Sequence, residues 1–214
     1  IVRKMYEFEF GTNDADKNNF IRCFLKGRKV PSNTTNGFQY GIGSIIYFTG
    51  NGDSINFIQN KLVYGYNGVY NASSCTANTY SGNSIDTSGS SGIYTTQQNS
   101  LKLLDNTFNM GDFGAGKGHY VSYAMRIETS PSMVMAGNKI FMYATNASVC
   151  RAIVIAAITS PSTAPALVYN NLLMNSAGTT SCTGFAIYGS NYVSFLNNNV
   201  LITNTFADGA AFHL

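Results

Sequence analysis

Short runs of alternating apolar and polar residues recur along the chain, and an asparagine interrupts each of them. Alternation with a period of two is typical of a strand that buries one face. An Asn between two such strands usually marks a turn, but repetition at five places predicts a feature of the architecture. The five stretches are SINFIQNKLVYG (54–65), SSGIYTTQQNSLKLLDNTFNMG (90–111), SMVMAGNKIFMY (132–143), APALVYNNLLMN (164–175) and YVSFLNNNVLIT (192–203).

Aligned on their asparagines, the repeats lie 46, 32, 32 and 28 residues apart. Flanking columns are apolar except for Pro165, and a further alternation precedes each repeat, so each unit carries three short strands. The aligned asparagines are Asn60, Asn106, Asn138, Asn170 and Asn198. The column three residues earlier is Phe57, Leu103, Met135, Leu167 and Phe195, and the column two residues later is Leu62, Phe108, Ile140, Leu172 and Val200. The column four residues later is Tyr64, Met110, Met142, Met174 and Ile202, and the upstream alternation reads Tyr47/Thr49, Ile93/Thr95, Met125/Ile127, Ile153/Ile155 and Phe185/Ile187.

A three-strand unit of about 30 residues cannot bury its own apolar face and has to stack on copies of itself. Equivalent strands then pair in parallel about 4.8 Å apart, and the aligned asparagines form a hydrogen-bonded ladder at a corner; the simpler alternative is a separate turn at each one. The sequence therefore predicts an all-β parallel β-helix of about five to seven coils over residues 31–214. Residues 1–30 are predicted to be an N-terminal cap or a degenerate first coil.

Two stretches, GIYTTQQNSLKLLDNTF and GFAIYGSNYVSFLNNNVLIT, resemble the parallel β-helix repeat of the pectate-lyase-like superfamily. The segments YGSNYVSFLNNNVLITNTFADGAAFHL and VYNNLLMNSAGTT are similar to repeats in cell-surface proteins exported by bacterial type IX secretion. The resemblance covers roughly residues 40–214. It implies a right-handed coil, as does the usual hand of parallel crossovers, and an exported protein.

The amino-acid composition indicates where the protein is located. Only 11% of the 214 residues are charged, against about 25% in globular proteins, and a surface of hydroxyls and amides suits an extracellular or cell-surface location. The net charge of +3 does not support nucleic-acid binding. No apolar run reaches the roughly 18 residues of a membrane span. Because the chain begins with Ile, we take it as a processed product or a fragment, and the lack of a signal peptide carries no information.

Candidate chemistry is sparse. The 10 acidic residues do not share a column or lie close together within the repeats, whereas polysaccharide-cleaving enzymes need convergent carboxylates. Arg126, Glu128 and Arg151 are the remaining candidates, and an Arg–Glu pair is more often a surface ion pair. His119 and His213 have no partners at triad spacing. We therefore predict no catalytic residues, metal ligands or cofactor.

Cysteines and tyrosines leave alternatives open. Cys150 and Cys182 stand at equivalent positions of adjacent repeats, where they are either two small buried residues or a disulfide between coils. Tyr66, Tyr70 and Tyr80 lie among Ser, Gly and Asn, a composition typical of adaptable recognition loops. The same stretch, 65–91, can also be an ordinary insertion or part of an extra coil, which would account for the 46-residue spacing.

Two functions follow from these observations. The first is a non-enzymatic secreted or cell-surface protein: a stalk, an adhesin, a coat component or a segment of a longer exported protein. The second is a carbohydrate-active enzyme or its sugar-binding remnant. Scarce carboxylates favour the first, with carbohydrate or other surface and secretion components as partners. Three or more charged side chains gathered in one groove would favour the second.

Overall fold

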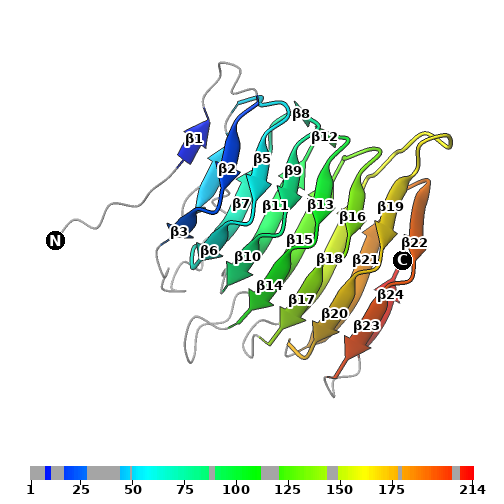
Figure 1. Ribbon diagram of the computed structural model, residues 1–214. Coiled ribbons are helices and arrows are strands. Elements are labelled where there is room, and N and C mark those ends of the chain that lie inside the picture. Colours follow the sequence, from blue (N-terminus) through cyan, green and yellow to red (C-terminus); the bar gives the residue numbers. More distant parts are fainter. Residues whose placement is uncertain are drawn as a thin grey trace.

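The chain folds into a parallel β-helix. The computed structural model describes residues 8–10, 17–27, 44–48, 50–86, 90–111, 121–143, 149–177, 180–203 and 208–214. Over these residues it has strands β1 to β24 and no helix, and accordingly no helix long and apolar enough to span a membrane. Three long sheets, here named A, B and C, run side by side along the molecule (Figure 1). The predicted all-β solenoid is confirmed.

The three sheets are built by strands that recur in a fixed order, A then B then C. Sheet A has eight strands: β1 (Phe8–Phe10), β4 (Ile46–Phe48), β7 (Asn67–Asn71), β11 (Ser91–Thr96), β15 (Val121–Glu128), β18 (Val149–Ala156), β21 (Ser181–Tyr188) and β24 (Asp208–His213). Sheet B has seven: β2 (Asn19–Ile21), β5 (Asn56–Ile58), β9 (Thr79–Ser81), β13 (Lys102–Leu104), β16 (Val134–Ala136), β19 (Ala166–Tyr169) and β22 (Val193–Leu196). Sheet C has seven: β3 (Phe24–Lys26), β6 (Lys61–Val63), β10 (Ser84–Asp86), β14 (Thr107–Met110), β17 (Lys139–Met142), β20 (Leu172–Asn175) and β23 (Asn199–Ile202). A short sheet D, β8 (Cys75–Thr76) with β12 (Gln98–Asn99), joins A to B in two coils.

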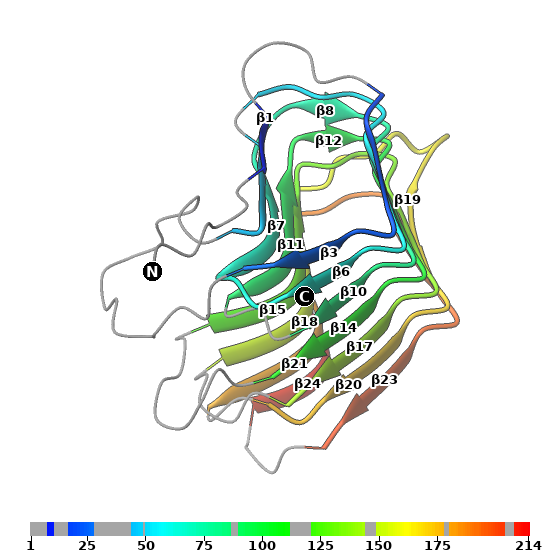
Figure 2. The ribbon, with the colours of Figure 1, turned by 60° about the vertical axis from the view of Figure 1, so that its left-hand side comes forward.

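Each coil contributes one strand to each long sheet, and equivalent strands of successive coils lie side by side (Figure 2). Sheets B and C have seven strands each, which define seven coils in the described residues. Strand β24 adds one more strand to sheet A. This number lies within the predicted range. The N-terminal segment takes part in the stack, because β2 and β3 pair with β5 and β6.

The interior is filled by columns of apolar side chains, one from each sheet. Every side chain in the following columns is at most 2% exposed. Sheet A supplies Ile46, Val69, Ile93, Met125, Ile153 and Phe185; sheet B supplies Phe57, Tyr80, Leu103, Met135 and Val168; and sheet C supplies Leu62, Ile85, Phe108, Ile140 and Leu173. Burying such side chains is worth about 1.5–3 kcal/mol each, so the stack of columns is the main source of stability.

A column of small residues brings sheets A and C close together. A Cβ atom at Gly92 would lie 2.6 Å from Phe108 Cδ1 and 2.7 Å from the carbonyl oxygen of Ala124. At Gly184 the corresponding contact is 2.5 Å, to Val200. Because real Cβ atoms do not approach this closely, packing requires glycine at these positions of β11 and β21.

The 46-residue spacing hides a complete additional coil. Strands β7, β8, β9 and β10 form it, between the coils of Asn60 and Asn106. The alignment missed this coil because Asn78 occupies the inward position held by Ile55 and Leu101 in the neighbouring coils. A polar residue in an otherwise apolar column conceals the repeat.

The predicted register was wrong in two coils. In β19 and β20 the inward residues are Ala166, Val168, Leu173 and Asn175, all fully buried. Leu167 therefore lies outside the inward stack, and Leu172 and Met174 are 40% and 38% exposed. In β4 the inward residues are Ile46 and Phe48, each 1% exposed, in place of Tyr47. A slip of one residue turns every side chain of a strand to the other face.

Candidate functional site

The outer face of sheet A carries a row of aromatic side chains that ends in an arginine. Tyr47, Tyr70, Tyr94 and Arg126 are register partners on four successive strands. The ring centroids of Tyr47 and Tyr70 are 5.5 Å apart, and those of Tyr70 and Tyr94 are 4.9 Å apart with an interplanar angle of 18°. We call these four residues the tyrosine–arginine row. Stacking along the row is a direct result of the 4.8 Å spacing of parallel strands.

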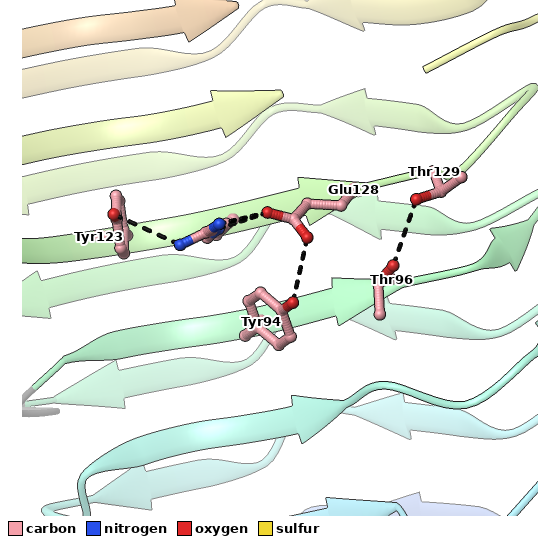
Figure 3. Close-up of polar contacts among 6 residues, drawn as sticks. Tyr94, Thr96, Tyr123, Glu128 and Thr129 are labelled. Carbon is pink, nitrogen blue, oxygen red and sulfur yellow. Dashed lines mark hydrogen bonds and ion pairs between the residues drawn. The ribbon is translucent and has the colours of Figure 1, made fainter. Parts of the chain in front are cut away.

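The guanidinium of Arg126 holds the end of this row together. Its Cζ lies 5.6 Å from the ring centroid of Tyr94 and 5.3 Å from that of Tyr123, within cation–π range. Its Nε donates to Glu128 Oε1 at 2.6 Å, and Nη2 forms an ion pair with the same carboxylate. The Tyr94 hydroxyl donates to Glu128 Oε2 at 3.1 Å (Figure 3). Both oxygens of this carboxylate are thus engaged.

The Tyr94 phenol and the Arg126 guanidinium both keep their protons at neutral pH. Burial, reinforced by the charge of Glu128 and the hydrogen bond to it, raises the pKa of Tyr94 above its usual value. Burial alone would lower the pKa of Arg126, but the hydrogen bond to Glu128 and the charge of that carboxylate outweigh it, and the pKa is raised. The phenol and the guanidinium therefore both remain donors to Glu128.

A small hollow opens beside the row. Its volume is about 20 Å³, and Arg126 is the charged residue among its lining residues. A space of this size holds about one water molecule. The lining residues are Tyr66, Asn67, Tyr70, Ser90, Ser91, Tyr94, Tyr123 and Arg126.

The chemistry open to this face is limited by its carboxylates. Glycoside hydrolysis uses two carboxyl groups about 5–9.5 Å apart. Among the described side chains, Glu128 is on the outer face of sheet A, whereas Asp86 lies in sheet C and pairs with Lys61 at 3.5 Å. Asp53 accepts a hydrogen bond from the Thr76 backbone in another coil. In the described part of the chain, no three His, Cys, Asp or Glu residues are grouped as metal ligands.

Arg151, which the sequence singled out together with the Arg126–Glu128 pair, lies at another position of sheet A, in β18. Arg151 is the register partner of Tyr123, and its guanidinium lies 5.7 Å from the ring centroid of Tyr188. Tyr188 also meets the ring of His213 at 5.8 Å. His119 lies outside the described residues.

The three tyrosines proposed as a recognition loop belong to a coil instead. Tyr80 lies in β9, inside the core, with 1% exposure, and its ring stacks on Phe57 at 5.1 Å. Tyr70 lies in β7 and is 8% exposed. Tyr66 is half-buried just before β7 and lines the hollow. The sequence did not single out Tyr47, Tyr94 and Tyr123 as site residues. Comparison of the outward positions of aligned strands could have revealed them.

Asparagines form a continuous ladder at the corner between sheets B and C. Asn138 is a representative member, since its Oδ1 accepts hydrogen bonds from the backbone N–H of Asn106 and from the Asn106 side chain, both at 3.0 Å. Its Nδ2 donates to Leu103 O at 2.8 Å and to Asn171 Oδ1 at 2.9 Å. The ladder consists of Asn60, Asn83, Asn106, Asn138, Asn171 and Asn198.

Two members of the ladder differ from the sequence alignment. Asn83 belongs to the additional coil, and Asn171 takes the place assigned to Asn170. Asn171 is fully buried, whereas Asn170 is exposed with a φ of 55°. Asn is one of the few non-glycine residues that tolerate this left-handed conformation, so Asn170 forms the bend that brings Asn171 into the ladder.

Cys150 and Cys182 are neighbours without a bond. They are register partners in β18 and β21, both fully buried, and both are free thiols. The Cys182 thiol donates to Asn175 O at 3.3 Å. Of the two alternatives that the sequence left open, the structure has the pair of small buried residues.

The two thiols are expected to make the protein sensitive to alkaline pH. Burial and the neighbouring Cys182 raise the pKa of Cys150 from 9.0 to about 12, and burial raises the pKa of Cys182 to about 11. Their contribution to stability is fully present below the unfolded pKa near 9 and is lost as the pH rises through the folded values. Urea unfolding between pH 7 and 11.5 should show the free energy of unfolding falling above pH ~9.

The matched control for this experiment is the double variant Cys150→Ala/Cys182→Ala. It should be less stable at pH 7, since two core side chains are truncated, yet its stability should fall less steeply above pH ~9. Equal slopes in the two proteins would contradict the assignment of alkaline sensitivity to these thiols.

No protein-family model matches the chain, and no curated protein is significantly similar to it.

Proposed function

We propose that this chain is a non-enzymatic β-helical protein of the cell surface or the extracellular space. In this role it acts as a stalk, an adhesin or a coat component, or as a segment of a longer exported protein. The observation that carries the proposal is the environment of Glu128, the carboxylate beside the tyrosine–arginine row. Arg126 and Tyr94 hydrogen-bond to its two oxygens, and Arg126 also forms an ion pair with it, an arrangement that suits a structural carboxylate that ties neighbouring strands together.

The row itself is better suited to joining coils than to holding a ligand. Sugar rings bind to the open faces of aromatic side chains, but here Tyr70 is covered by Tyr47 on one side and Tyr94 on the other. The remaining face of Tyr94 meets Arg126. Together with the low charge of 11%, this arrangement favours a rigid, weakly charged rod.

A second candidate is a sugar-binding module, and the tyrosine-lined hollow is the observation in its favour. Hydroxyl and guanidinium groups at the rim could bind one polar substituent of a saccharide. The hollow admits only about one water molecule, so this function would depend on shallow contacts along sheet A. Loss of saccharide binding in Tyr66→Ala, with binding retained in Tyr143→Ala directly after β17, would identify it.

The proposal predicts no turnover of acidic or neutral polysaccharides, with or without Ca²⁺. Absorbance of unsaturated products and reducing-end assays on pectin, alginate and neutral glycans measure this directly. Release of products by the protein, abolished in Glu128→Gln, would instead establish a carbohydrate-active enzyme built on Glu128, Arg126 and Arg151.

Location is tested independently on the cells that make the protein. Antibody labelling and protease treatment of intact cells, together with analysis of the culture medium, should find the chain outside the cell. Recovery of the chain only after lysis would overturn the proposed location.

A further inference from the structure

A group of buried polar side chains lies inside the β-helix in the coils of β7–β10 and β11–β14. Its side chains replace the apolar residues that other coils place there, and each is at most 3% exposed. We call it the interior polar cluster, and it consists of Asn71, Cys75, Asn78, Tyr80, Thr95 and Gln98.

Most of this cluster is internally hydrogen-bonded. Gln98 Oε1 accepts from Asn78 Nδ2 at 3.1 Å and from Asn71 Nδ2 at 3.5 Å. Gln98 Nε2 donates to Ser73 O at 2.6 Å and to Thr96 O at 3.0 Å. These contacts fix the amides at the corner where sheet D joins A to B. The cluster is therefore a built feature, with its amide groups satisfied.

Two hydroxyls of the cluster are the exception. Tyr80 Oη and Thr95 Oγ1 are buried and have no hydrogen-bond partner in the described structure. Tyr80 extends from sheet B across the interior toward Asn71 in sheet A, and although the Asn71 amide influences its hydroxyl, no hydrogen bond of good geometry joins them. Thr95 is the register partner of Asn71, about 4.8 Å along the sheet. Asn71 is thus a neighbour of both hydroxyl-bearing residues.

A buried hydroxyl without a partner destabilises the fold, and two of them beside the same amide need a common explanation. Tyr80 and Thr95 are neutral, each able to donate and to accept, and the other members of the cluster are amides and a thiol. An ion would find no opposite charge there, whereas water offers two donors and two acceptors. We infer that an ordered water molecule binds inside the β-helix and bridges Tyr80 Oη to Thr95 Oγ1.

Isosteric substitutions test this site. With the water in place, Tyr80→Phe and Thr95→Val each remove one of its partners, and each should lower the midpoint of thermal unfolding by roughly 2–4 °C. Without a water, each substitution removes an unsatisfied hydroxyl and should leave the midpoint unchanged or raise it. The double variant excludes the water altogether, so its loss should be smaller than the sum of the two single losses.

Controls use the same substitutions at exposed or half-exposed sites. Tyr143→Phe, where Tyr143 is 50% exposed, and Thr107→Val in sheet C should both leave the midpoint nearly unchanged. A crystal structure at high resolution should show a density peak within hydrogen-bond distance of both hydroxyls, absent in the double variant. Single variants as stable as the parent, or a direct Tyr80–Thr95 hydrogen bond with no water between them, would overturn the inference.

Discussion

Replacing Asn171 with Ala is expected to lower the free energy of unfolding by about 3 kcal/mol or more. Asn171 Oδ1 accepts hydrogen bonds from the backbone and the side chain of Asn138 at 3.0 and 2.9 Å. Its Nδ2 donates to Met135 O at 3.2 Å and to Asn198 Oδ1 at 2.9 Å. Alanine would leave the buried backbone N–H of Asn138 without its acceptor and would break the ladder on both sides. Urea unfolding followed by far-ultraviolet circular dichroism measures the loss.

The adjacent residue provides the matched control. Asn170 is exposed and has a φ of 55°, a conformation that glycine adopts without strain. Asn170→Gly should therefore change the free energy of unfolding by less than about 1 kcal/mol. A larger loss for Asn170→Gly than for Asn171→Ala would restore the original alignment, in which Asn170 belongs to the ladder.

The architecture could be predicted from the sequence because the strands read as strict alternations. In SLKL (100–103) and TFNM (107–110) apolar residues alternate with polar ones, so the buried face is unambiguous. Stacking then follows physically, since a unit of about 30 residues has no other way to bury that face. Leu103, Met135 and Phe108 were placed inward on this basis, and all are fully buried.

The errors arose where this contrast disappears. In APALVYNNLLMN both phases of the alternation are apolar and two asparagines stand side by side, so neither the face nor the ladder position can be chosen locally. Only pairing with the neighbouring coils selects Asn171, because it alone reaches Asn138 and Asn198. In the coil of β7–β10 the inward positions hold Asn71, Asn78 and Tyr80, and a search for apolar columns cannot detect them.

The outer surface was less predictable than the core for a related reason. Tyr70, Tyr94 and Arg126 lie 24 and 32 residues apart in sequence, and they meet only because the strands stack in register. The asparagine ladder and the row of rings thus arise from the same parallel pairing. This repetition of equivalent contacts from coil to coil is what makes a structural role the better account of the tyrosine–arginine row.

A second large effect is expected in β20, where two leucines differ by one position. Leu173 is fully buried in the column that also holds Ile140, whereas Leu172 is 40% exposed. Leu173→Ala leaves a cavity between two coils and should cost about 2–5 kcal/mol. Leu172→Ala removes a side chain already in contact with solvent and should cost about 0.5 kcal/mol or less.

Comparing Leu173→Ala with Leu172→Ala tests the register of this coil, because the same substitution is made at two adjacent positions. Both variants lose the same atoms from the same strand, so a difference in the free energy of unfolding reports only on which face each side chain occupies. Equal losses, or a larger loss for Leu172→Ala, would mean that β20 is shifted by one residue. Asn171 would then leave the ladder as well, because only two peptide bonds join it to Leu173 and the strand shifts as a unit. The asparagine and leucine experiments therefore have to agree in direction if the coil is folded as described.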